Sequence, residues 1–163
     1  MRHLDTYIGL ADHSEATLAD AFRTIAEGHA HVPDIFHTCE LLARFSDDHR
    51  RSLEPVIDRY GEQRSGDVEE PERLHAAGLA EARTGEVGLL LDLQDLHVLA
   101  DLVQTTWTVI SQAAQGLRDR ELAGVAEQAA SDTARQLAWL NTRIKAAAPQ
   151  TLIVSPHLPE PPT

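Results

Sequence analysis

The chain has 163 residues, which is the length of one ordinary domain and enough to bury a core without disulfides or a structural metal. Only 4% of the residues are aromatic, and glycine and proline lie mostly outside the periodic segments, so helices are favoured over a sandwich or barrel. The net charge of −12 repels phosphate backbones and anionic lipids, which argues against nucleic acids and membrane surfaces as partners.

The first predicted helix covers residues 4–31. Its apolar residues recur at steps of four and three, which is the spacing of one helix face. Glu15 and His29 fall on that same face as polar exceptions. Pro33 marks the end of the helix, because proline restricts the residue before it and cannot continue the hydrogen-bond ladder.

A second helix is predicted from Pro33 to about Tyr60. Proline is tolerated in a first turn, and the inward face carries Cys39, Ser46 and His49 among apolar residues. Pro55 lies inside this pattern and is expected to kink the helix or end its regular part. Cys39 is the only cysteine, which excludes an internal disulfide and a cysteine-based zinc site.

Residues 62–86 are polar and interrupted by glycine and proline, and residues 71–82 within them have the composition of a short helix. A connection of this length is uncommon between adjacent antiparallel helices. It is long enough to cross the whole length of a bundle, so we predict such a crossover here.

The third helix is predicted over residues 89–117, where the apolar stripe is unbroken and includes Trp107. Asp119 is the expected N-cap of a fourth helix that continues to about Ala148. Pro149 is expected to stop this helix, and residues 151–154 read as a short extended run. We therefore expect a bundle domain over residues 1–148 and a Pro-rich tail over 149–163.

The predicted fold class is all-α, a four-helix bundle in which two antiparallel hairpins are joined by the long crossover. Helices rise about 1.5 Å per residue, which places His49 roughly 22 Å into the second helix. Counting back along the first helix reaches Glu15 at this depth, and His97 lies within about 6 Å of the same level on the third. Asp101 follows one turn after His97 and can reach it. We therefore predict a polar layer in the core.

This arrangement resembles the ferritin-like superfamily, whose members place a Glu on one helix of each hairpin and a Glu-x-x-His on the other. The chain has Glu15, Ser46-x-x-His49 and Gln94-x-x-His97, so the diagnostic Glu-x-x-His pair is absent. The resemblance implies a metal-binding protein, with a redox or iron-handling role and a reduced site. We predict Glu15, His49, His97 and Asp101 as metal ligands, for iron, manganese or zinc.

Three alternatives stay open. Glu15 and His49 could be a buried hydrogen-bonded pair without a metal, or an acid–base pair in a small-molecule pocket. The chain could also be a non-enzymatic module that assembles with itself, as a dimer, or with another protein; whether it is an enzyme is left open. Trp107 and Trp139 are interpreted as core or interface residues, and Glu27 with His31 as a weaker surface candidate for metal.

The predicted location is the cytoplasm. No apolar run approaches the length of a membrane span, and the first ten residues lack the apolar core of a signal peptide.

Overall fold

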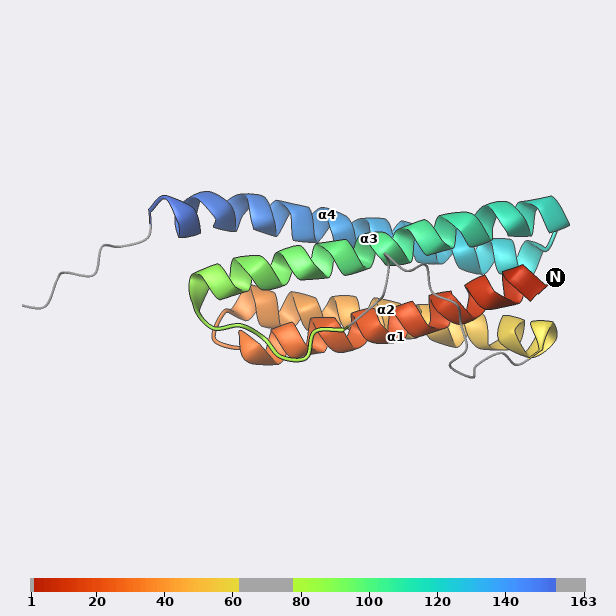
Figure 1. Cartoon of the computed structure of the whole chain (residues 1–163), viewed down its shortest axis with the longest axis horizontal. Helices are drawn as coiled ribbons and strands as arrows, with labels where there is room; N and C mark the ends of the chain where they lie inside the picture. Colours follow the sequence, from red (N-terminus) through yellow and green to blue (C-terminus); the bar gives the residue numbers. More distant parts are fainter. Residues whose placement is uncertain (1, 62–77, 155–163) are drawn as a thin grey trace, which may run out of the picture.

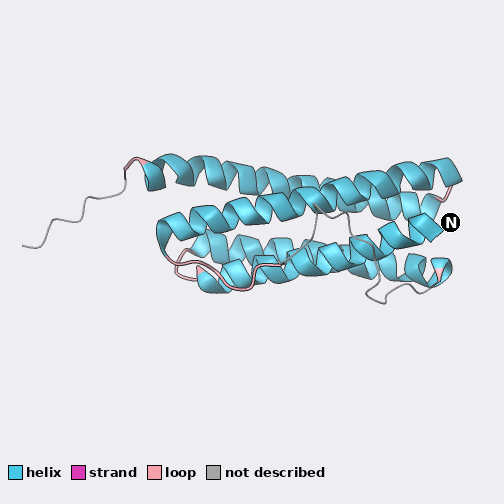
Figure 2. Cartoon of the chain, in the orientation of Figure 1, coloured by secondary structure: helices cyan, strands magenta, loops and turns pink. Residues whose placement is uncertain are grey.

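The protein is described by a computed structural model over residues 2–61 and 78–154. Within these two ranges all regular structure is α-helical and no strand is present (Figure 2). None of the helices in the described part has an apolar stretch long enough to cross a membrane. The four helices are α1 (Arg2–Gly28), α2 (Pro33–Tyr60), α3 (Gly85–Leu117) and α4 (Arg120–Leu152).

The helices form two antiparallel hairpins, α1 with α2 and α3 with α4 (Figure 1). α2 ends at one end of the bundle and α3 begins at the other, so these two helices run in the same direction. Across the hairpins, α1 packs on α3 and α2 packs on α4. The predicted four-helix bundle with a long crossover is therefore confirmed, and its core is a single cluster of buried apolar side chains.

Most helix boundaries lie close to their predicted positions, and the exception is the end of α4. α2 ends at Tyr60 as predicted and does not end at Pro55, which lies inside the helix. α4 continues through Pro149 to Leu152, so the predicted stop at Pro149 and the extended run over residues 151–154 are wrong. Proline removes one donor, but its carbonyl still accepts the backbone N–H of Ile153 at 3.1 Å. Residues 71–77 of the predicted short helix lie outside the described residues, and residues 78–84 are not helical.

The end of the crossover is fixed to the bundle by Asp92, a buried carboxylate on α3. Its Oδ2 lies 2.8 Å from Nε2 of His29 and accepts the backbone N–H of Arg83 at 3.0 Å. The guanidinium of Arg83 donates to Oδ1 at 2.7 Å. His29, the unexplained polar residue on the inner face of α1, is therefore buried with a partner. One carboxylate holds together α1, the crossover and α3.

A second carboxylate, Asp119, joins the opposite end of the bundle. It accepts the backbone N–H of Leu122 at 3.0 Å, which confirms it as the N-cap of α4. The same carboxylate accepts the hydroxyl of Tyr60 at 2.6 Å and the guanidinium of Arg59 at 3.0 Å. The last turn of α2 is thereby held against the first turn of α4.

The end of α1 lies very close to the crossover at Gly28. A Cβ placed on Gly28 would lie 2.2 Å from Cβ of Ala82, a contact that no side-chain rotation can relieve. Gly28→Ala should lower the free energy of unfolding by about 1–3 kcal/mol in urea titrations, because the crossover must move. Gly124→Ala is the control, since no atom lies within 4 Å of its new methyl group. Equal stability of the two variants would contradict this packing.

Candidate functional site

The centre of the bundle contains a polar layer to which each helix contributes one side chain: Glu15 from α1, His49 from α2, Trp107 from α3 and Asp132 from α4. Nδ1 of His49 lies 2.7 Å from Oε1 of Glu15, and Nε2 lies 3.0 Å from Oδ2 of Asp132. The indole N–H of Trp107 donates to the same Oε1 of Glu15 at 2.8 Å. The four helices are thus connected through one chain of hydrogen bonds.

The protonation of His49 follows from its two partners. A neutral imidazole has one donor and one acceptor nitrogen, whereas an ionised carboxylate can only accept. Contact with a carboxylate oxygen at both ring nitrogens therefore favours the imidazolium, which donates at Nδ1 and at Nε2. Glu15 and His49 are buried, with 0% and 3% of their surface exposed, so the two charges face each other away from water.

The pKa of His49 is raised above its ordinary value. Burial by itself disfavours the charged ring and lowers this pKa, but the hydrogen bond and charge of Glu15 and then of Asp132 outweigh burial. At Asp132, burial raises the pKa of the carboxyl, and hydrogen bonds from His49 and Gln128 lower it further than burial raises it. Both shifts favour the ion pair.

One turn away, Gln136 of α4 extends the layer toward α2. Its amide nitrogen donates to the carbonyl of Leu42 at 2.9 Å and to the hydroxyl of Ser46 at 3.2 Å. Two acceptors near this level, Oε2 of Glu15 and Oε1 of Gln136, are buried and have no hydrogen-bond donor among the described residues. The polar layer therefore has more acceptor oxygens than hydrogen-bond donors to satisfy them.

The structure brings together two of the four predicted site residues. Glu15 and His49 meet as predicted, but Trp107 of α3 faces them instead of His97. Ten residues separate these two positions, which is about 15 Å along a helix. His97 is half-buried and Asp101 is exposed, and the structure places neither beside Glu15. His97 would lie at this level only if α2 and α3 began at the same height, whereas the layer lies 16 residues into α2 and 22 residues into α3.

Trp107 and Asp132 are the members of the layer that sequence reasoning missed. Trp107 lies on the apolar seam and reads as a core residue, although a buried indole N–H usually has an acceptor. Asp132 directly precedes Thr133, which is on the inward seam of α4. The signal available in the sequence was a buried Glu15 that needed more donors than one imidazole provides.

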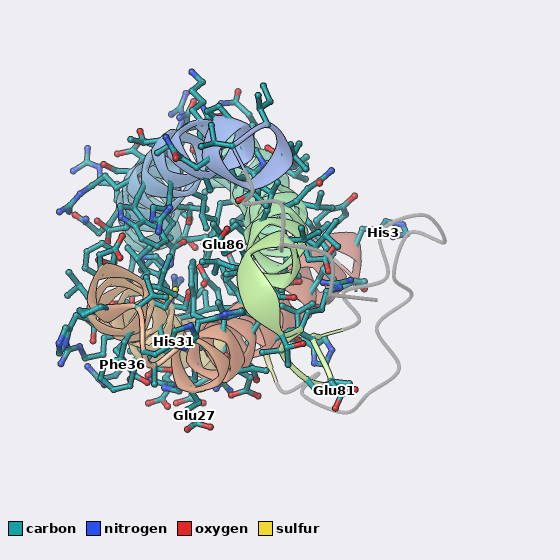
Figure 3. All side chains as sticks on the ribbon, turned by 90° about the vertical axis from the view of Figure 1, so that its left-hand side faces the viewer. His3, Glu27, His31, Phe36, Glu81 and Glu86 are labelled. Atoms are coloured by element: carbon teal, nitrogen blue, oxygen red, sulfur yellow. The ribbon has the colours of Figure 1, made fainter. Side chains whose placement is uncertain are left out.

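The weaker surface candidate for a metal site was Glu27 with His31, and no metal-binding cluster is found around it in the described residues. Glu27 points away from the bundle at the end of α1 (Figure 3). In the described ranges, no group of three or more His, Cys, Asp or Glu side chains is arranged to hold a metal ion.

The residues of the layer do not fit the two-metal centre that the ferritin-like resemblance implies. Ser46 stands where a carboxylate is needed three residues before His49, and Arg135 stands three residues after Asp132 where a histidine is needed. On α3 the position facing Glu15 is Trp107, which can donate a hydrogen bond but cannot ligate a metal. Too few ligands remain for two ions.

The raised pKa of His49 predicts a specific pH dependence of stability. A histidine whose pKa is raised on folding stabilises the folded state fully below its ordinary pKa of 6.5, and this contribution is lost as pH rises through the folded value. His49→Gln should therefore cost about 3–5 kcal/mol near pH 6 and less at alkaline pH, measured by urea unfolding.

The matched control is His37→Gln on the exposed side of α2, which should leave the free energy of unfolding unchanged across the same pH range. A cost of His49→Gln that stays constant or grows with pH would contradict an imidazolium at this position.

Comparisons with known proteins identify no relative of this chain. No protein-family model, no curated protein and no solved structure matches the chain.

Proposed function

We propose that this chain is a non-enzymatic, self-assembling helical module of ferritin-like architecture whose core holds a proton on His49 in place of a metal. The observation that carries the proposal is the contact of both ring nitrogens of His49 with carboxylate oxygens, at 2.7 and 3.0 Å. A metal ligand must offer a bare nitrogen lone pair, and an imidazolium has none.

Residues that cannot bind a metal well stand where the ferritin-like resemblance implies carboxylate ligands, and this supports the same conclusion. Ser46 is neutral, and the indole of Trp107 occupies the α3 position and uses one oxygen of Glu15. An acid–base role is also disfavoured, because a substrate would have to displace the carboxylates that already hold both nitrogens of His49. A polar layer of this kind can instead specify how helices align, as buried polar residues do in some coiled coils.

The proposal includes two predictions from the sequence, a homodimer and a cytoplasmic location. The acidic net charge of −12 suits a protein whose copies stay dispersed and do not aggregate.

A second candidate function, a single-metal site, is favoured by one observation. Oε2 of Glu15 is buried without a donor, and a buried carboxylate oxygen in this state attracts a cation. Glu15 and Nδ1 of His49 would then hold iron, manganese or zinc. Asp132 would keep the other ring nitrogen oriented, as carboxylates commonly do behind metal-binding histidines.

One experiment separates these two candidates. The protein is purified without chelators after growth with added iron, manganese and zinc, and its metal content is measured beside that of His49→Gln and the exposed control His37→Gln. We expect only traces of metal in all three proteins. Stoichiometric metal that disappears in His49→Gln but remains in His37→Gln would contradict the proposed function and establish the single-metal site.

A further inference from the structure

The members of the polar layer differ in how far they are from solvent. Glu15 and Trp107 are fully buried, and only 3% of His49 is exposed. The amide of Gln136, one turn away, is fully buried as well. Asp132 stands apart from these residues, because 16% of its side chain is exposed. Asp132 is therefore the member of the layer that meets solvent, at the boundary between α2 and α4.

The carboxylate of Asp132 contacts the core on one side and the surface on the other. Its Oδ2 lies 3.0 Å from Nε2 of His49. Its Oδ1 accepts the guanidinium of Arg135 at 3.4 Å, and the side chain of Gln128 also donates to the carboxyl group. Arg135 and Gln128 are both exposed on α4. One carboxylate thus connects the buried imidazole to groups that lie in water.

Arg135 lies across the boundary at which Asp132 meets solvent. The central carbon of its guanidinium is 5.0 Å from the centre of the Phe45 ring, so the side chain reaches from α4 to α2. The Arg135 side chain is nevertheless 68% exposed. Exposed ion pairs and exposed cation–π contacts are each weak. Arg135 can therefore swing away from Asp132 while the helices stay packed.

The other ring nitrogen of His49 faces a closed environment. Nδ1 lies 2.7 Å from Oε1 of Glu15, and that oxygen also accepts the indole N–H of Trp107. Both of these partners are fully buried. Water can reach Nδ1 only if helices separate, and such an opening costs more than the movement of one exposed side chain. The two nitrogens of one ring therefore differ in their access to solvent.

From this asymmetry we propose that the proton on His49 enters and leaves the folded bundle through Asp132, with Arg135 as a movable cover. The inference rests on the proposed function, which places a proton on this ring. In the outward step the Nε2–H bond breaks and the proton moves to Oδ2 of Asp132. It then passes from the carboxyl group to water, which leaves a neutral ring and an ionised carboxylate. Uptake is the reverse, so the layer gains or loses this charge without unfolding.

The first test compares the two ring N–H groups of His49 in the wild-type chain. Their rates of hydrogen exchange with water are measured by nitrogen-15 NMR at neutral pH. We expect Nε2–H to exchange about 10-fold or more faster than Nδ1–H, because exchange at Nε2 needs no separation of helices. Exchange that occurs only through unfolding of the bundle would instead give the two nitrogens equal rates.

The second test removes the movable cover. Arg135→Ala should raise the exchange rate at Nε2 by about two- to fivefold, because only weak contacts hold the guanidinium, and should leave the rate at Nδ1 unchanged. Arg51→Ala is the matched control. Arg51 also pairs with an aspartate three residues earlier, Asp48, and its side chain is 71% exposed, but it does not contact the layer. This variant should leave both rates unchanged.

The outcomes distinguish this inference from the proposed function. A ring with one bare nitrogen at neutral pH would overturn both. A ring that is protonated at both nitrogens but exchanges them at equal rates, or exchanges Nδ1–H faster, would overturn the route through Asp132 and leave the proposed function standing. A rate at Nε2 that is no higher in Arg135→Ala than in Arg51→Ala would overturn the route in the same way.

Discussion

The pairing of His49 with Glu15 and Asp132 is the interaction on which the rest of the bundle depends. A carboxylate taken out of water without a partner costs several kcal/mol, so Glu15 can remain fully buried only if its donors stay in place. Those donors come from α2 and α3, and His49 in turn binds α4. Sliding any one helix by a turn would leave a buried charge unpaired. The layer therefore fixes the alignment of all four helices, which apolar packing alone specifies less sharply.

Carboxylates perform the same task at both ends of the molecule. Asp92 joins the end of α1 to the crossover and to α3, while Asp119 caps α4 and holds the end of α2. With Glu15 between them, acidic side chains tie the helices together at three levels. Much of the remaining acidity in the described part of the chain lies on the surface.

The four helices and the Glu15–His49 half of the polar layer could be predicted from the sequence, and the physical reasons are clear. Apolar spacing and the prolines and glycines between helices reveal the elements, and the rise per residue brought Glu15 to the level of His49. The partner on α3 could not be found in this way, because the level of α3 depends on where a long crossover ends. His97 was therefore expected where Trp107 is found. The predicted stop at Pro149 is wrong because a proline in a helix interior does not always end the helix, and α4 continues past it to Leu152.

The ring of His49 offers the most direct test of the buried ion pair. Nitrogen-15 NMR of the imidazole at neutral pH reports whether each ring nitrogen carries a proton. We predict that both Nδ1 and Nε2 of His49 are protonated and that this state persists above the ordinary histidine pKa of 6.5. A neutral ring with one bare nitrogen at neutral pH, or a ring that titrates like an exposed histidine, would contradict the ion pair that is proposed to align the bundle.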